Sequence, residues 1–308
     1  MESDKMLKIF NCQFTSAHFF KIVRMIIMTI FLQNFAIQMK INKNLEIAIE
    51  ASIDAGKVVI EVYDTEFKVE IKGDKSPLTE ADKRANDIIN SFLIPTGIPI
   101  ISEENKQIDY KIRKNWDTCW IVDPVDGTKE FVKRNGEFTV NIALVKQGKP
   151  ILGVIYVPVS KVLYFANVES NEAYKITLES HSTPVEKILA SAIPIEPNVN
   201  SSNPIKVVGS RSHLNQKTLD FLEALKEKAN VEIISIGSSL KFCLVADGEA
   251  DLYPRFSPTM EWDTAAGQAI CNAVGVEVVS KDTNESLLYN KENLLNPNFL
   301  VSKKDSKS

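Results

Sequence analysis

The spacing of apolar and polar residues along the chain predicts four helices. Between Asn42, a candidate N-cap, and about Tyr63, apolar residues recur three or four positions apart, which is the spacing of one helix face. Further helices are expected at 79–93, at 217–228 and, in an alanine-rich stretch, at 261–273. Between these helices, apolar residues form shorter runs without helical spacing.

The shorter runs predict strands, because they are four to eight residues long and are bounded by turn residues. They lie at 67–71, 99–102, 120–122, 138–145, 151–157, 162–166, 173–176, 205–208 and 231–236. A Gln-Gly-Lys-Pro turn at 147–150 predicts a hairpin, so we expect the first sheet to be at least partly antiparallel. After residue 205, strands alternate with helices, which predicts an α/β layer.

A stretch rich in Pro, Ser and Asn at 179–204 predicts a domain boundary. We therefore expect an α+β domain at 41–200, a smaller α/β domain at 201–302 and a Lys/Ser-rich tail at 303–308. A length of 308 residues is enough for one large or two ordinary domains.

Residues 1–40 have a different composition from the rest of the chain, and we interpret them as an extension. The apolar run at 25–32 is much shorter than the roughly 20 residues that cross a membrane. A secretory signal and an amphipathic segment on a membrane surface are two alternatives. We favour a native start at Met39, because periodic sequence begins directly after it. We therefore expect a cytoplasmic protein without an integral membrane span, with peripheral association at the inner membrane face as the alternative.

The composition is that of an ordinary globular protein, with 44% apolar and 25% charged residues. A net charge of −4 gives no reason to expect nucleic-acid binding, so an anionic ligand would have to be attracted locally. The four cysteines, Cys12, Cys119, Cys243 and Cys271, are scattered and form no C-x-x-C pair. They fit reduced thiols in the cytoplasm better than disulfides or a zinc site.

Candidate chemistry is concentrated after the apolar strand at 120–122. Asp123 and Asp126 follow directly as that strand ends, and clustered carboxylates suit a hard cation such as Mg²⁺. Gly127 and Thr128 come next, where the free N–H groups of a helix start could bind a phosphate oxygen. The sequence therefore indicates metal-assisted phosphoryl chemistry, with a solvated surface turn as the alternative.

Other carboxylates have structural alternatives of their own. Glu103 and Glu104 follow the strand at 99–102, where adjacent acids are often a solvated turn. Asp82 lies three residues after Thr79, which is the spacing of a helix capping box. Asp263 lies where a helix is expected to begin and could be only its N-cap.

The run Asp-Pro-Val-Asp-Gly-Thr-Lys-Glu-Phe-Val-Lys-Arg-Asn-Gly-Glu-Phe-Thr-Val-Asn at 123–141 resembles the metal-binding signature of the inositol monophosphatase-like superfamily of lithium-sensitive phosphatases. It looks most like the branch of bacterial 3'(2'),5'-bisphosphate nucleotidases, and the resemblance covers about residues 41–302. The resemblance implies a layered αβαβα fold, with a mostly antiparallel N-terminal sheet and a smaller C-terminal α/β domain. It also implies two or three Mg²⁺ ions.

Within that family, the matching positions imply roles for individual residues. Asp82 and Thr128 would orient the attacking water. Glu104 would be a weaker candidate beside the metal. The implied metal ligands are Glu103, Asp123, the backbone carbonyl of Val125, Asp126 and, from the second domain, Asp263.

Three segments resemble those that bind the ribose and second phosphate of a nucleotide, at 210–213, 237–241 and 253–256. Taken alone, His213 would be a loop histidine and Lys241 a solvated lysine. The implied substrate-binding residues are Gly127, Thr128, Arg211, His213, Ser238, Ser239, Lys241, Arg255 and Asp263.

The resemblance implies that 3'-phosphoadenosine 5'-phosphate is hydrolysed to AMP and phosphate, as part of sulfur metabolism. The partner would then be a small nucleotide bisphosphate. An inositol or sugar monophosphatase using the same metals is the nearer alternative, and a non-catalytic nucleotide- or metal-binding protein on this fold is the remote one. The sequence predicts no oligomeric state.

Overall fold

The computed structural model describes residues 43–66, 69–71, 77–198, 203–209 and 215–303. Residues 44–308 form one compact unit. Its helices are α3 (Lys43–Tyr63), α4 (Glu80–Leu93), α5 (Tyr110–Arg113), α6 (Thr128–Val132), α7 (Val185–Ser191), α8 (Gln216–Lys226), α9 (Leu240–Ala246) and α10 (Ala265–Ala273), with 3₁₀ turns η1 (Ile94–Thr96) and η2 (Glu261–Asp263).

The first sheet has seven strands in the order β3-β4-β5-β6-β7-β8-β9. They are β3 (Ile100–Ser102), β4 (Thr118–Asp126), β5 (Thr139–Lys146), β6 (Lys149–Val157), β7 (Val162–Asn167), β8 (Glu172–Thr177) and β9 (Ile193–Pro194). Only the pair β3–β4 is parallel. This sheet is therefore mostly antiparallel, as predicted.

The second sheet has five strands in the order β11-β10-β12-β14-β13. They are β10 (Ile205–Gly209), β11 (Val231–Ser235), β12 (Leu252–Arg255), β13 (Val276–Ser280) and β14 (Phe299–Lys303). Strand β10 is parallel to β11 and β12, whereas β14 is antiparallel to its neighbours. A separate antiparallel pair is formed by β1 (Val69–Ile71) and β2 (Pro77–Thr79).

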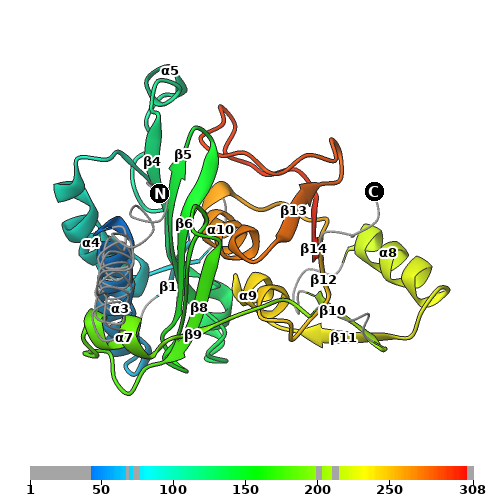
Figure 1. Cartoon of the computed structure of the whole chain (residues 1–308). Coiled ribbons are helices and arrows are strands. Elements are labelled where there is room, and N and C mark those ends of the chain that lie inside the picture. The colour runs from blue at the N-terminus through cyan, green and yellow to red at the C-terminus, as the bar shows by residue number, and fades with distance from the viewer. Residues whose placement is uncertain (1–42, 67–68, 72–76, 199–202, 210–214, 304–308) are drawn as a thin grey trace, which may run out of the picture. The chain divides into compact units, whose positions relative to one another are not determined.

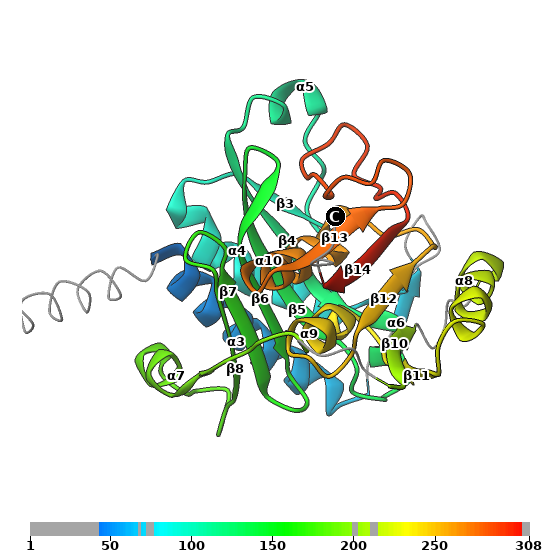
Figure 2. The same ribbon diagram turned by 45° about the vertical axis from the view of Figure 1, so that its right-hand side comes forward.

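The helices and sheets form alternating layers (Figure 1). Helices α3, α4 and α7 cover one face of the seven-stranded sheet, and α9 and α10 lie between the two sheets. Helix α8 lies on the far side of the five-stranded sheet, and the turned view in Figure 2 gives the same order. This is the layered αβαβα fold that the sequence predicts.

Helix α10 fits between the sheets because its residues are small. It contacts β5, β6 and β7 on one side and β13 on the other. On β6, a Cβ added at Gly153 would lie 2.4 Å from the carbonyl oxygen of Ala266, so only glycine permits this approach. On α10 itself, a Cβ at Gly267 would lie 2.4 Å from the ring of Phe242. The close packing joins both sheets to a single middle layer.

The predicted helices and strands are confirmed within the described residues, with four corrections. The helix expected at 261–273 begins only at Ala265, and residues 261–263 form the separate 3₁₀ turn η2. Strand β4 continues through Asp126, although the sequence suggested an end at residue 122. The stretch 179–204 contains helix α7 and strand β9, and β9 pairs with β8 in the first sheet. Strand β14 includes Lys303, the first residue of the expected tail. Division into two domains near residue 200 stays a prediction.

Within the described ranges, no helix combines the length and apolar character needed to cross a membrane. The three described cysteines, Cys119, Cys243 and Cys271, are buried free thiols.

Candidate active site

A β-bulge in β4 brings Asp123 and Asp126 to the same side of the sheet. Residues three apart on a regular strand point to opposite faces. Here Asp123 pairs with Asn141 and Asp126 pairs with Thr139, so β4 has one more residue than β5 between the two pairs. The extra residue restores a common direction for the two carboxylates. Asp123 is 1% exposed, and both side chains line one pocket.

Glu103 reaches the same pocket from the neighbouring strand. Because β3 and β4 are parallel, their carboxyl ends meet at one edge, and the Glu103 N–H donates to the carbonyl of Val122 (3.2 Å). The loop after β3 is attached to α4 by buried side chains. The Ser102 hydroxyl donates to Asn86 Oδ1 (2.8 Å), and Asn86 Nδ2 donates to Asn105 Oδ1 (2.9 Å). Glu103 is thus flanked by anchored residues.

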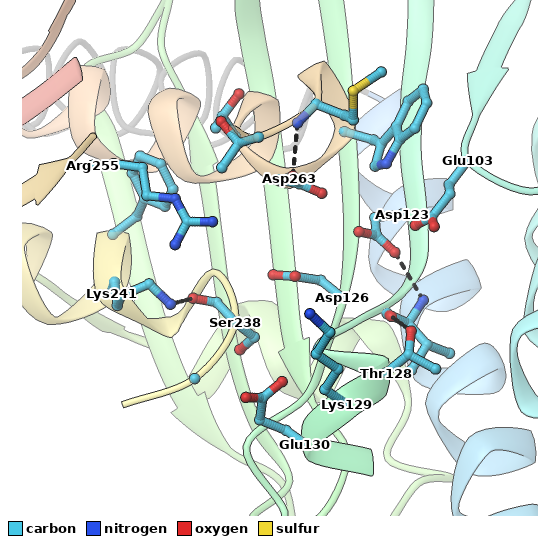
Figure 3. Close-up of a pocket in the computed structure, with 18 of the residues that line it drawn as sticks. Glu103, Asp123, Asp126, Thr128, Lys129, Glu130, Ser238, Lys241, Arg255 and Asp263 are labelled. Carbon is cyan, nitrogen blue, oxygen red and sulfur yellow. Dashed lines mark hydrogen bonds between the residues drawn. The ribbon is translucent and has the colours of Figure 1, made fainter. Parts of the chain in front are cut away.

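Asp263 lies opposite these strands, at the end of η2 (Figure 3). Its Oδ2 accepts the backbone N–H of Met260 (2.8 Å). Helix α10 begins at Ala265, and its N-cap, Thr264, makes no side-chain capping bond. Asp263 is therefore not the N-cap of α10, but its carboxylate does cap the preceding turn η2 from position N3, and it also lines the pocket.

Asp123, Asp126 and Asp263 each offer one carboxylate oxygen, and these three oxygens lie within 4.8 Å of one another. Burial, reinforced by the nearby carboxylates, raises the pKa of Asp123 well above its usual range. Burial and the charge of Asp126 raise the pKa of Asp263 to about 8. Asp123 Oδ2 is buried and has no hydrogen-bond partner among the described residues. Three oxygens of like charge and an unpartnered carboxylate oxygen fit a bound hard cation.

Asp82 and Thr128 form a second feature beside this cluster. Asp82 is 1% exposed, and its Oδ2 accepts both the N–H (2.7 Å) and the hydroxyl (2.6 Å) of Thr79. Its Oδ1 accepts the Thr128 hydroxyl (3.3 Å), which also lies 3.2 Å from the Val125 carbonyl oxygen. The capping box is confirmed, and the same carboxylate also contacts Thr128. The two interpretations of Asp82 are compatible, because each oxygen makes one of these contacts, and the role in orienting water stays a prediction.

Gly127 gives the chain the backbone conformation that starts α6. Its φ of +94° belongs to the left-handed region. A Cβ at this position would lie 3.1 Å from the carbonyl oxygen of Glu137 and 3.3 Å from Cβ of Ser238. Glycine therefore lets the loop before α9 close against the start of α6.

The opposite wall of the pocket carries two cationic side chains, Lys241 and Arg255 (Figure 3). Lys241 Nζ donates to the carbonyl of Ser238, and burial is the main reason that its pKa falls to about 8. Arg255 Nη2 donates to the carbonyl of Pro258 (3.3 Å), whereas its buried Nε has no partner among the described residues. The Ser238 hydroxyl is likewise buried and unpartnered. These donors suit an anionic ligand.

The pocket has a volume of about 330 Å³. Its walls combine the carboxylate cluster, the start of α6 and the cationic wall. It is lined by Glu103, Asp123, Val125, Asp126, Gly127, Thr128, Lys129, Glu130, Gly237, Ser238, Lys241, Phe242, Tyr253, Arg255, Pro258, Thr259, Met260, Trp262, Asp263 and Thr264.

Of the predicted substrate residues that the structure describes, Ser239 is not part of this lining. Arg211 and His213 lie outside the described residues. Ser239 is 2% exposed and lies beneath the pocket, where its hydroxyl donates to Asp126 Oδ2 (2.6 Å). Glu104 is also absent from the lining, and its N–H lies 3.4 Å from the Ser102 hydroxyl.

Among the residues at the site to which the sequence interpretation assigned no role, three lie within the predicted metal-binding signature. Lys129 and Glu130 line the pocket, and Asn141 lies beneath it with its amide 3.4 Å from Asp126 Oδ2. All three belong to the run 123–141. Asn141 could have been found from its position two residues after Thr139, because alternate residues of a strand share a face.

Comparison with known sequences gives a consistent result. The inositol monophosphatase family matches residues 41–307. The chain is 44% identical over 262 residues to a 3'(2'),5'-bisphosphate nucleotidase, CysQ, of Salmonella typhimurium, covering 84% of this chain and 99% of that protein. It is 43% identical to the CysQ of Escherichia coli K12, covering 81% of this chain and 95% of the relative.

Solved structures agree with the sequence matches. The crystal structure of CysQ from Bacteroides thetaiotaomicron, described as a bacterial member of the inositol monophosphatase family, is similar with a TM-score of 0.78 and 48% identity. The similarity covers 87% of this chain and 100% of that one. The suhB protein of Bartonella henselae is 22% identical with a TM-score of 0.67, covering 85% of this chain and 95% of that one, and shows the fold alone. From the family match and these close relatives, the chain belongs to the inositol monophosphatase family.

Proposed function

We propose that this protein is a 3'(2'),5'-bisphosphate nucleotidase that hydrolyses 3'-phosphoadenosine 5'-phosphate to AMP and phosphate. The observation that carries the proposal is a pocket whose two walls differ in charge. The carboxylates of Asp123, Asp126 and Asp263 lie on one side, and Lys241 and Arg255 lie on the other. A substrate with two phosphates fits such a pocket, because each wall can take one. Relatives 43–44% identical over most of the chain carry the name of this activity.

The carboxylate wall would hold the metal, and we propose two or three Mg²⁺ ions there. The ligands would be Glu103, Asp123, Asp126 and Asp263, together with the Val125 carbonyl. When bound, such ions lower the pKa of a water molecule and offset negative charge on the phosphoryl oxygens. Asp123 Oδ2, which is buried and has no hydrogen-bond partner in the part of the chain that the structure describes, supports a cation at this position.

Thr128 and Asp82 would orient the attacking water. The single hydroxyl proton of Thr128 can be donated to Asp82 Oδ1 or to the Val125 carbonyl. In either state its lone pairs are free to accept from a water molecule in the pocket. Asp82 stays fixed meanwhile, because its other oxygen accepts two bonds from Thr79. The water oxygen bonds to phosphorus, and the bond from phosphorus to the 3' oxygen breaks. Of the two water protons, one ends on the 3' oxygen and the other stays with the released phosphate.

The cationic wall would hold the phosphate that is not cleaved. Arg255 and Lys241 lie across the pocket from the carboxylates, so their contacts are remote from the reacting bond. Ser238 lies on the same wall, and its hydroxyl has no hydrogen-bond partner within the described ranges. The amides of Gly127 and Thr128, at the start of α6, would hold oxygens of the cleaved phosphate. Arg211 and His213 stay predicted contacts to the nucleotide.

A phosphate-release assay tests the proposal, with 3'-phosphoadenosine 5'-phosphate, inositol 1-phosphate and fructose 1,6-bisphosphate as substrates. We expect the highest kcat/KM for the nucleotide, dependence on Mg²⁺, and inhibition by millimolar or lower LiCl that equal KCl does not reproduce. A higher kcat/KM for inositol 1-phosphate would favour the monophosphatase alternative. Binding of the nucleotide without any release would favour a non-catalytic protein.

We also propose a cytoplasmic location and a role in sulfur metabolism. The buried free thiols of Cys119, Cys243 and Cys271 support a reducing compartment. Peripheral membrane association stays a separate prediction that concerns residues 1–40.

A further inference from the structure

Two adjacent serines before α9 face in opposite directions. Ser238 has a φ of +49° and lines the pocket. Ser239 has a φ of −71° and is buried beneath the pocket, with 2% of its surface exposed. The sequence gives both the same predicted role in substrate binding, but the structure gives them different surroundings.

The Ser239 hydroxyl contacts groups from three other elements. It lies 2.6 Å from Asp126 Oδ2 on β4, 3.0 Å from the Asp263 carbonyl oxygen on η2, and 2.8 Å from Asn141 Nδ2 on β5. A hydroxyl donates one proton, and the short contact to a carboxylate favours donation to Asp126. Asn141 then donates to the Ser239 oxygen. The Ser239 oxygen is therefore hydrogen-bonded to Asp126 and Asn141 and lies in direct contact with the backbone carbonyl oxygen of Asp263.

Asn141 is itself held in one orientation. Its Oδ1 accepts the Thr139 hydroxyl (2.9 Å), and Asn141 is 1% exposed. The amide group therefore points towards Ser239 Oγ (2.8 Å) and Asp126 Oδ2 (3.4 Å). Together these bonds occupy Asp126 Oδ2 and leave Oδ1 for a cation.

We infer that Ser239 and Asn141 are positioning residues for the metal site: they fix the Asp126 carboxylate and its separation from Asp263, and Ser239 does not contact the substrate. The inference rests on one part of the proposed function, which is that a divalent cation binds at the carboxylates. Hydrogen-bond partners of metal ligands typically change metal affinity by about 10- to 100-fold when they are removed. Ser239 and Asn141 are such partners of Asp126.

The experiment compares Ser239→Ala with its neighbour Ser238→Ala as the matched control. Mn²⁺ binding is measured without substrate, from the loss of the free-ion electron paramagnetic resonance signal. The KM for 3'-phosphoadenosine 5'-phosphate is then measured at saturating Mg²⁺. We expect Ser239→Ala to weaken Mn²⁺ binding by about tenfold or more and to leave KM nearly unchanged. Ser238→Ala should raise KM and leave Mn²⁺ binding unchanged.

Unchanged Mn²⁺ binding in Ser239→Ala, with a raised KM, would overturn the inference and restore Ser239 as a substrate contact. If Ser239→Ala does not fold, Asn141→Ala tests the inference instead. This substitution removes the second hydrogen-bond donor to Asp126 and should weaken Mn²⁺ binding in the same way. Wild-type Mn²⁺ affinity in Asn141→Ala would then overturn the inference. The metal measurement needs no turnover, so it can succeed even if the nucleotidase assignment fails.

Discussion

At the scale of single residues, Asp126 is expected to be essential for chemistry without stabilising the fold. It lies among like charges, and its Oδ2 accepts bonds from Ser239 and Asn141. We predict that Asp126→Asn abolishes phosphate release, because the site loses a charge needed to hold Mg²⁺. The melting temperature in metal-free buffer should stay the same or rise, since repulsion with Asp123 and Asp263 is reduced. Loss of both activity and metal-free thermal stability would indicate a structural aspartate instead.

Lys241 gives a prediction about pH. Burial is the largest cause that lowers its pKa to about 8, and the Arg255 charge lowers it further. The side chain is therefore charged below pH 8 and loses its proton as the pH rises through 8. We predict that kcat/KM for 3'-phosphoadenosine 5'-phosphate, divided by that for adenosine 3'-monophosphate, falls above pH 8. The phosphates themselves are already fully ionised there.

Dividing by kcat/KM for the monophosphate cancels the pH dependence of groups that act on both substrates. In Lys241→Arg, whose side chain stays charged, the ratio should be flat from pH 7 to 9.5. A ratio that falls equally in Lys241→Arg would assign the titration to another group.

At the scale of single residues, the sequence predicted the candidate site best where the chemistry requires a particular residue type. Carboxylates near the ends of two strands could be predicted to lie together, because parallel neighbouring strands end at one edge. The different positions of Ser238 and Ser239 could not be predicted, since they depend on a single positive φ value and on burial by other elements.

At the scale of elements, the start of α6 depends on a glycine in a left-handed backbone conformation. Gly127 has a φ of +94°, and the Cβ of an alanine would also press on Glu137 and Ser238. We predict that Gly127→Ala loses about 1–3 kcal/mol of unfolding free energy from backbone strain alone. Activity should fall as well, because the turn carries Asp126 and Thr128. Chemical denaturation and phosphate release measure the two effects.

Gly97→Ala is the matched control for this prediction. Its φ of +70° is also left-handed, but no atom lies within 4 Å of the added Cβ. We expect it to lose stability while it keeps full activity. Wild-type activity in Gly127→Ala would contradict the role given to this turn.

Long periodic elements such as α3 could be predicted from the sequence because their apolar spacing is regular over many residues. The seven-residue helix α9 has no side-chain cap, so nothing local marks its start. The bulge in β4 was also missed, because it is visible only when the strand is aligned with β5. The continuation of β4 through Asp126 depends on that pairing.

At the scale of the whole molecule, α10 joins the two sheets. Its contacts with β6 and β13 are made by small buried residues, and Gly153 has no room for a Cβ. Unfolding of either sheet would expose this helix. We therefore predict one cooperative thermal transition for residues 44–308, seen at the same temperature by calorimetry and by circular dichroism. Two separated transitions would instead support independent domains divided near residue 200.

The central claim is that one wall of the pocket serves the cleaved phosphate and the other serves a second phosphate. Arg255 tests it, because its buried Nε has no partner among the described residues and its guanidinium faces the pocket. Hydrogen bonds to charged groups contribute about 1.5–3 kcal/mol each, which corresponds to roughly 10- to 100-fold in kcat/KM. The adenosine 3'-monophosphate substrate lacks the second phosphate and would not make this contact.

The measurement is kcat/KM for 3'-phosphoadenosine 5'-phosphate and for adenosine 3'-monophosphate, in the wild-type protein and in Arg255→Ala. The account predicts a loss of roughly 10- to 100-fold for the bisphosphate and almost no change for the monophosphate. Equal losses for both substrates would contradict it, because Arg255 would then serve the cleaved phosphate or the fold.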